Sequence, residues 1–339
     1  MAKQAITYEQ IMAALQRKEY KPVYMLTGDE PYYIDKIADY IEKNVLTEDE
    51  KAFNQMVVYG KDTDLRDIII AAKRFPMMAD HQVIIVKEAQ SIKNYDDLVF
   101  YLKQPQPSTI LVFCHKYDKL DGRKKSTLAI AEKGILFESK KLYDNQVAGW
   151  IEAYGKSKNV SIDAKTANIL ADFLGNDLSR IVHEIDKLLI LLTDSDNKRI
   201  TPELVEQNIG ISKDYNNFEL LKALGDRNIL KANRIIDYFG KNPKNNPLIV
   251  TISVVFNFFA NLLLYHSLKD KSQMNVAAEL KINPYFVRDY QQAARNYNTG
   301  KTLQIIGDLR RADAQSKGFG NASANDAEIL KELVFRILH

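Results

Sequence analysis

The sequence predicts an α/β module followed by helical domains, and three observations support this fold class. Short apolar runs alternate with helical patterns from about residue 22 to 140. Beyond residue 142 almost only the helical period of 3.6 remains. A chain of 339 residues also exceeds what one hydrophobic core usually supports, so two or three domains are expected.

Five runs of β-branched or aromatic residues predict the strands of the first module, at residues 23–26, 56–59, 83–86, 110–114 and 135–137. Each run is almost continuously apolar, which is typical of strands that crossover helices bury on both faces. Helical patterns at residues 33–45 and 65–75 separate some of these runs. We therefore expect a parallel sheet covered by helices.

After residue 142 the sequence predicts two groups of helices. The first has helices at residues 147–154, 164–174 and 178–192, and a short one that starts at Thr201-Pro202 with proline in its first turn. Ser161 and Asp163 are candidate caps, and Gly175-Asn176 predicts a helix end.

A second boundary is expected near residues 210–215, and a helical bundle follows it. Its helices are expected at residues 218–224, 229–239, 248–268, 276–280, 285–295, 303–314 and 327–338. The expected domains are therefore residues 1–142, 143–212 and 213–339.

Composition excludes several classes of protein. The 47 lysines and arginines nearly balance 44 acidic residues, so the net charge of +3 does not by itself indicate nucleic-acid binding. The single cysteine, Cys114, lies in an apolar run and cannot form an internal disulfide, which fits a reducing cytoplasm. The first residues lack the apolar core of a signal peptide, and no run of 18 apolar residues indicates a membrane span.

The first predicted strand runs into Thr27-Gly28-Asp29-Glu30, where a nucleotide-binding protein of this layout would place its phosphate loop. A phosphate loop needs several glycines, a lysine for the phosphates and a serine or threonine for Mg²⁺. Here Gly28 stands alone, and two carboxylates that would repel a triphosphate follow it. The sequence thus predicts the layout of a nucleotide-binding protein without a nucleotide site.

No pattern in the sequence points to catalysis or to a metal. The five histidines, at positions 81, 115, 183, 266 and 339, have no metal-ligand spacing. Glu88 at the end of a predicted strand is the one candidate for a Mg²⁺-positioning acid, and a solvated charge is the favoured interpretation. We predict no catalytic residue, no cofactor and no metal site.

The segment between the second helix and the third strand is unusual because it places Phe75, Met77 and Met78 around Pro76, where loops are normally polar. Such residues usually fold back onto the sheet as core, and composition alone favours that interpretation. The alternative is an apolar plug for the pocket of a partner, a role that suits flexible and polarizable methionine.

Two further segments allow a plain and a functional interpretation. The basic cluster of Lys116, Lys119, Arg123, Lys124 and Lys125 is expected to be a solvated helix start, because Asp118 and Asp121 lie within it. Phe319 lies between Gly318 and Gly320 in a loop between helices. Its ring is either tucked into the bundle or free to stack on a nucleic-acid base.

Several segments together resemble the delta subunit of the bacterial DNA polymerase III clamp loader. The resemblance covers nearly the whole chain in order and rests on residues 23–32, 76–82, 120–125, 175–180 with 184–188, 218–225 and 282–287. It implies an AAA+-like parallel α/β module that lacks a P-loop, a small helical lid (143–212) and a helical collar (213–339) through which loader subunits assemble. It also implies partners: the sliding clamp (beta subunit), the delta prime and gamma or tau subunits, and primer-template DNA bound by the assembled complex.

The resemblance also implies roles for particular residues. Phe75, Pro76, Met77 and Met78 occupy the loop that inserts two bulky apolar side chains into a pocket of the clamp; many relatives have leucine or phenylalanine there. The implied function is to bind and open the clamp without intrinsic ATPase activity, in a holoenzyme whose activity is DNA-directed DNA polymerisation. The collar position of Phe319 makes it a possible DNA contact. The alternatives are an ATPase that acts on nucleic acid, and a helical adaptor without a clamp partner.

Overall fold

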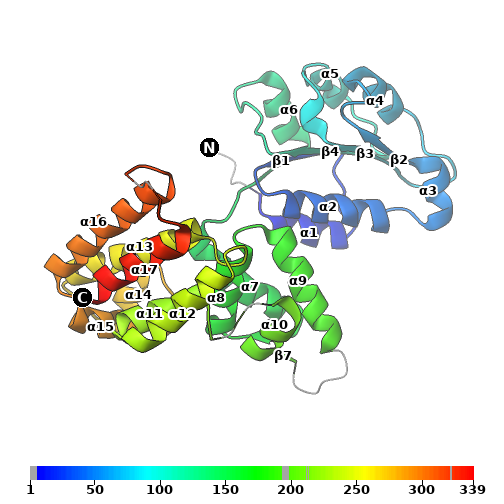
Figure 1. Ribbon diagram of the computed structural model, residues 1–339. Coiled ribbons are helices and arrows are strands. Elements are labelled where there is room, and N and C mark those ends of the chain that lie inside the picture. The colour runs from blue at the N-terminus through cyan, green and yellow to red at the C-terminus, as the bar shows by residue number, and fades with distance from the viewer. Residues whose placement is uncertain (1–5, 193–197, 211, 213, 321–322) are drawn as a thin grey trace. The chain divides into compact units, whose positions relative to one another are not determined.

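The computed structural model describes residues 6–192, 198–210, 212, 214–320 and 323–339. The chain forms two compact units, Met1–Leu142 and Tyr143–His339 (Figure 1). The first is an α/β unit and the second is almost entirely helical, which confirms the predicted fold class of a parallel α/β module followed by helices. The expected boundary near residue 212 within the second unit stays a prediction.

The first unit is built on a five-stranded sheet in the order β2-β3-β4-β1-β5, with all of its pairs parallel. The strands are β1 (Val23–Gly28), β2 (Gln55–Tyr59), β3 (Gln82–Lys87), β4 (Thr109–Lys116) and β5 (Ile135–Ser139). The helices are α1 (Tyr8–Gln16), α2 (Pro31–Asn44), α3 (Glu48–Asn54), α4 (Leu65–Ala72), α5 (Leu98–Lys103) and α6 (Lys125–Lys133), with a 3₁₀ turn at Ala89–Ser91.

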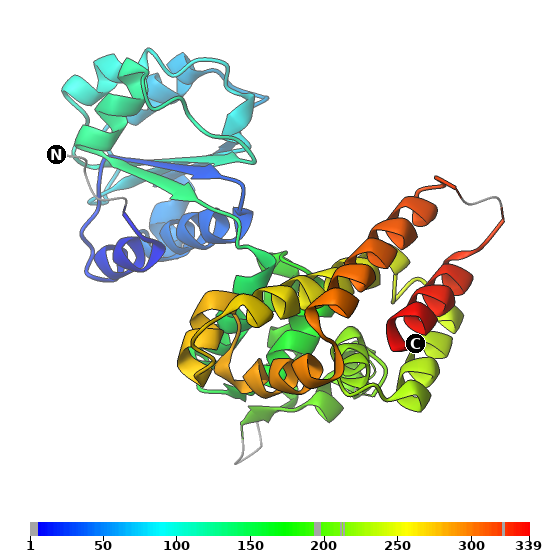
Figure 2. The same ribbon diagram turned by 90° about the vertical axis from the view of Figure 1, so that its left-hand side faces the viewer.

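Helices cover both faces of this sheet, with α1 and α2 on one side and α4, α5 and α6 on the other (Figures 1 and 2). Alternate residues of each strand serve the two cores: Leu26 packs with α1 and α2, whereas Met25 packs with α4 to α6. This double burial explains the almost continuous apolar runs. Cys114 lies in the first of these cores, and burial raises the pKa of its thiol to about 12.

The second unit begins with α7 (Asp144–Ser157), α8 (Ala164–Leu174), α9 (Leu178–Leu191) and α10 (Pro202–Ile209), joined by a small parallel pair, β6 (Ser161–Ile162) and β7 (Arg199–Ile200). A bundle follows. It contains α11 (Asn217–Gly225), α12 (Ile229–Lys241), α13 (Leu248–Ser267), α14 (Gln273–Leu280), a 3₁₀ turn (Pro284–Phe286), α15 (Val287–Asn296), α16 (Thr299–Ser316) and α17 (Asp326–Leu338).

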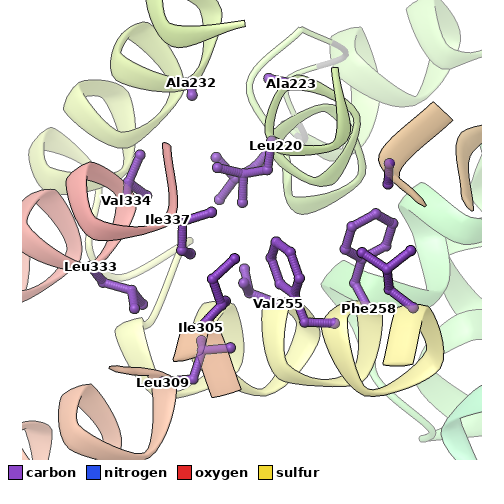
Figure 3. Packing of buried hydrophobic residues seen from close by; sticks show 14 of the residues in the cluster. Leu220, Ala223, Ala232, Val255, Phe258, Ile305, Leu309, Leu333, Val334 and Ile337 are labelled. Carbon is purple, nitrogen blue, oxygen red and sulfur yellow. The ribbon is translucent and has the colours of Figure 1, made fainter. Parts of the chain in front are cut away.

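The core of this bundle draws residues from every helix from α11 to α17, and Figure 3 shows part of it. Helix α13 contributes Val255 and Phe258 to it. The helix is long and apolar enough to cross a membrane, with a mean hydropathy of 2.1, and 44% of that apolar stretch is buried inside the structure. Because its buried face lies in the bundle core, core packing accounts for much of its apolar character.

The structure differs from the predicted elements in several places. Short helices α1, α3 and α5 and the β6–β7 pair had not been predicted, because such short segments show little periodicity. Ser161 lies in β6 and does not cap a helix; Asp163 caps α8 by accepting from the Thr166 amide at 2.8 Å. Helix α4 ends at Ala72 and not at residue 75, which leaves the residues before Pro76 in a loop.

Candidate apolar interaction site

Residues 75–78, which we call the apolar loop, lie between α4 and β3, before the N-terminal edge of the sheet. Phe75 is 79% exposed, Met77 is 62% exposed and Met78 is fully exposed, while Pro76 is half-buried. None of these four residues belongs to a hydrophobic core. The interpretation of these side chains as core, which composition alone favoured, is therefore wrong.

The backbone of the apolar loop is fixed by the side chain of Asn54, the last residue of α3. Its Nδ2 donates to the Met77 carbonyl at 2.9 Å, and its Oδ1 accepts from the Met77 amide at 2.6 Å. Asn54 is only 5% exposed, so both bonds are largely shielded from water. This pair of bonds holds the peptide groups of Met77 while its side chain stays in solvent.

A second buried amide fixes the start of the same segment. Gln82 at the beginning of β3 donates through Nε2 to the Arg74 carbonyl and to the Thr109 hydroxyl, both at 2.6 Å. Thr109 in turn donates to the carbonyl of Ala72 at 2.8 Å. The end of α4 is thus tied to β3 and β4, and the apolar loop is held on both sides.

Met78 has a left-handed backbone, with φ of +54°. Residues other than glycine adopt this conformation at a cost, and such strain gathers at functional sites. Met78 adopts this conformation although its side chain does not pack in the core. The exposed side chain of Met78 is therefore not needed for the core.

Two further exposed apolar side chains lie on the helices of this region of the sequence: Phe53, which directly precedes Asn54 in α3, and Ile70 on α4. Sequence reasoning missed both of them, and it also missed Asn54 and Gln82 as the residues that hold the loop. The exposure of Ile70 could have been predicted from the sequence, because three consecutive isoleucines, Ile68 to Ile70, cannot all face inward from a helix. No comparable signal marks Asn54.

The turn after β1 carries a carboxylate at the start of the following helix. Helix α2 begins at Pro31, and Glu30 accepts through Oε1 from the Tyr32 amide at 3.0 Å, so a carboxylate occupies the helix N-terminus where phosphate would bind. Gly28 has φ of +120°, and a Cβ there would lie 2.1 Å from the Ser139 carbonyl oxygen. This glycine serves close packing of β1 on β5.

The other polar residues considered in the sequence are either exposed to solvent or paired with acidic residues of the same unit. Glu88 is exposed at the end of β3, and among the described residues no group of three or more potential ligands could hold a metal ion. Within the basic cluster, Lys116 pairs with Asp35 at 2.6 Å, Lys119 with Glu138 at 2.7 Å and Arg123 with Asp121 at 3.0 Å. These ion pairs use up much of the charge that a nucleic acid would need.

Phe319 lies in the loop between α16 and α17 and is 74% exposed, so its ring is not packed into the bundle. Its amide donates to the Ala314 carbonyl at 2.9 Å. Gly318 and Gly320 on either side have φ of +86° and +70°, conformations that glycine adopts readily. Asn321, which follows Gly320 in the sequence, lies outside the described residues.

Comparisons with known proteins give a consistent result. A family profile described as "DNA polymerase III, delta subunit" matches residues 24–140, and the profile of the C-terminal domain of the same subunit matches residues 214–335. The DNA polymerase III subunit delta of Bacillus subtilis is 26% identical over 335 residues, covering 95% of this chain and 94% of its own length. A solved structure of the Bacillus subtilis DNA clamp loader delta protein has a TM-score of 0.53 and 25% identity, covering 98% of this chain and 99% of that one.

Proposed function

Because the chain belongs to the DNA polymerase III delta subunit family and is a clamp-loader subunit of DNA replication, we propose that its apolar loop docks on the sliding clamp. Docking through Met77 and Met78 would favour the open clamp ring. A ligand shifts such an equilibrium only by binding one state more tightly than the other. The open ring is therefore the state that gains more from the contact.

The observation that carries this proposal is a set of exposed methionines on a fixed backbone. Soluble proteins seldom gather large apolar side chains on their surface except at interaction sites, and Phe75, Met77 and Met78 are all exposed within four consecutive residues. The bonds from Asn54 and Gln82 order the backbone before the partner arrives. Preorganisation of this kind lowers the entropic cost of binding.

The remaining parts of the proposal concern assembly. The helical segments 143–212 and 213–339 would serve as lid and collar, and would join this chain to the delta prime and gamma or tau subunits in the cytoplasm. Glu30 at the start of α2 supports a role without nucleotide. We expect the isolated chain to bind no ATP in calorimetry, and stoichiometric binding at micromolar affinity would instead support the alternative of an active ATPase.

The proposal is tested by replacing Met77 and Met78 with alanine and measuring affinity for the cognate clamp by calorimetry. Full burial of each methionine is worth roughly 1.5–3 kcal/mol, so the double variant should bind at least about a hundredfold more weakly. Its melting temperature should not change, because both side chains are exposed. Unchanged affinity would refute the docking role, and failure of the unaltered chain to bind any clamp would favour the adaptor alternative.

A matched control removes two exposed apolar side chains that lie outside the apolar loop, on helices of the same unit. Phe100 on α5 and Leu128 on α6 are 68% and 58% exposed. The variant with alanine at both positions should bind the clamp like the unaltered chain. Equal losses in both double variants would show a general effect of surface hydrophobicity and no specific plug.

A second contact is supported by Phe319, whose exposed ring between two glycines is free to stack on a base. Base stacking on an aromatic ring is worth roughly 1–3 kcal/mol. Phe319→Ala should therefore weaken primer-template binding by the assembled loader up to about a hundredfold, and leave clamp binding by the isolated chain unchanged. Unaltered DNA affinity in a fully assembled variant complex would eliminate the stacking role.

A further inference from the structure

A groove of about 560 Å³ opens at the edge of the sheet where the parallel strands begin. Its walls come from the segments that lead into β1, β3, β4 and β5, and include Lys18, Tyr20, Lys21, His81, Pro107 and Lys133. We call it the basic groove. The residues assigned to clamp docking do not include any of these.

The basic groove and the apolar loop lie along one edge of the molecule. All strands of a parallel sheet begin at the same edge, and the order β2-β3-β4-β1-β5 places the loop before β3 and the groove from β3 to β5. His81 follows the loop in sequence and lines the groove. Neighbouring strands are about 4.8 Å apart. A partner bound to Met77 and Met78 therefore reaches the groove if it extends across the starts of the next few strands.

The groove carries positive charge that the chain does not neutralise. Lys18 and Lys21 are exposed and form no ion pair within the described residues, and Lys133 has only its neighbour Glu132, at 3.3 Å. The acidic residue in the wall, Glu19, is held by Arg17 through two bonds of 2.9 and 3.1 Å, and its charge also acts on Lys21. The three lysines outnumber this one carboxylate, so the groove keeps a net positive charge for an acidic ligand.

The walls between these cations are suited to a peptide chain. Tyr20 meets the ring of His81 edge-on at 5.2 Å, and Pro105 and Pro107 form an apolar side. The walls therefore offer aromatic rings and proline side chains to a bound segment.

Lys18 itself occupies an unfavourable backbone position. It follows the end of α1 with φ of +59°, and the amides of Lys18 and Glu19 donate to the carbonyls of Leu15 and Ala14 in the closing pattern usual for glycine. A lysine at this position brings strain that glycine would avoid. This closing turn fixes the backbone of Lys18 where the residue lines the groove.

We propose that the basic groove binds an acidic peptide segment of the same partner that receives the apolar loop. This inference rests on the proposed clamp docking and names a second contact for it. Lysine ammonium groups would pair with carboxylates of the segment, while Tyr20 and the prolines contact its backbone. Charges at the rim of an interface act mainly on the rate of association, so the groove would guide the partner onto the loop.

The test measures association and dissociation rates with the cognate clamp, without DNA, for Lys18→Glu combined with Lys21→Glu. The association rate should fall on the order of tenfold at low salt, with a dissociation rate changed less than about threefold. The difference should shrink at 1 M salt, where the screening length is about 3 Å. Met77→Ala combined with Met78→Ala should instead raise the dissociation rate.

The matched control is Lys61→Glu combined with Lys93→Glu, which makes the same change in net charge at the opposite edge of the sheet, where β2 and β3 end. Equal association rates in the two charge-reversed variants would overturn the groove contact and leave loop docking intact. Unchanged binding by the methionine variant would overturn the docking proposal itself. The two failures are therefore distinguishable.

A third variant, Lys18→Gly combined with Lys21→Ala, guards against misfolding, since glycine suits the left-handed position of residue 18. It should melt no lower than the unaltered chain. Its association rate should also fall, but by less than that of the variant with glutamate at both positions. If the charge variants bind the clamp normally but lose affinity for primer-template DNA in the assembled loader, the groove binds phosphates and the acidic-peptide proposal is wrong.

Discussion

At the scale of single residues, the site depends on separating the backbone of the apolar loop from its side chains. Asn54 and Gln82, whose side chains are largely buried, satisfy backbone groups of the loop segment, and the side chains of Met77 and Met78 take no part in the core. Stability and binding then rest on different atoms. Single substitutions should be able to change one without the other.

Met78→Gly should keep or raise the stability of the fold while it weakens clamp binding. Glycine relieves the left-handed conformation at φ of +54°, so the melting temperature should stay constant or rise. Loss of the methionine side chain should weaken clamp binding on the order of ten- to a hundredfold. Thermal melting and calorimetry on one preparation measure both effects.

Tyr117→Gly is the matched control for this variant, because Tyr117 is also exposed and left-handed, with φ of +61°. It lies after β4, at the opposite edge of the sheet. It should show a similar effect on stability and unchanged clamp affinity. A loss of melting temperature in Met78→Gly alone would mean that Met78 supports the fold.

Asn54→Ala should lower stability and affinity together, although Asn54 is buried and would not touch the clamp. The variant leaves the Met77 amide and carbonyl without their partners, which costs about 1–3 kcal/mol. The loop also loses its fixed shape, so binding should weaken through a higher entropic cost. Chemical denaturation and calorimetry measure the two losses.

Asn44→Ala removes a comparable bond, from Nδ2 to the Tyr40 carbonyl at 2.9 Å, from the exposed end of α2. It should change stability by no more than about 0.5 kcal/mol and leave affinity unchanged. Normal clamp affinity in a folded Asn54→Ala protein would show that loop order does not contribute to binding.

At the scale of elements, segments with a regular hydrophobic pattern could be predicted from the sequence, and segments without one could not. The runs that became β1 to β5 are apolar enough to be recognised, and so are helices such as α8 and α9 with a continuous buried face. The pair β6 and β7 has strands of two residues each, too short for any period to appear. Such elements form because the surrounding helices bring them together.

The apolar loop shows the same limit within the site. Phe75, Met77 and Met78 could be identified from their type and their position between a helix and a strand. Their exposure could not, because it depends on Asn54, which is distant in sequence and reaches Met77 only in the folded chain. The resemblance to clamp-loader delta subunits supplied a role that local pattern did not.

Asp172 on α8 is expected to make the stability of the second unit depend on pH. Burial, together with the nearby charge of Asp144, raises the pKa of its carboxyl to about 7; Arg180, Lys222, Lys244 and Asp289 line the adjoining cavities. The folded state therefore holds this proton more tightly than the unfolded chain does. Its contribution is greatest below the usual aspartate pKa, near 4, and is lost as pH rises to about 7.

Asp172→Asn should accordingly be more stable than the unaltered chain at pH 8, on the order of 2 kcal/mol, and no more stable near pH 4. Urea unfolding across this range measures the difference. Glu279→Gln, at an exposed position on α14, is the control and should give a difference that does not vary with pH. A pH-independent effect in Asp172→Asn would show that Asp172 is charged in the fold.

At the scale of the whole molecule, the parts of the proposed docking site come from one unit. The apolar loop, both residues that hold it and the basic groove all belong to Met1–Leu142, which has a separate core on each face of its sheet. The helical unit has its own core. Clamp docking should therefore need no contribution from the helical unit, whereas assembly of the loader should.

A fragment of residues 1–142 should consequently fold and bind the clamp with nearly the affinity of the full chain. Circular dichroism and cooperative melting would establish the fold, and calorimetry the affinity. The change of Met77 and Met78 to alanine should weaken binding equally in the fragment and in the full chain, since it acts on the same contact. A folded fragment that fails to bind would place part of the docking surface in the helical unit, and an unfolded one would show that this sheet needs the helical unit for stability.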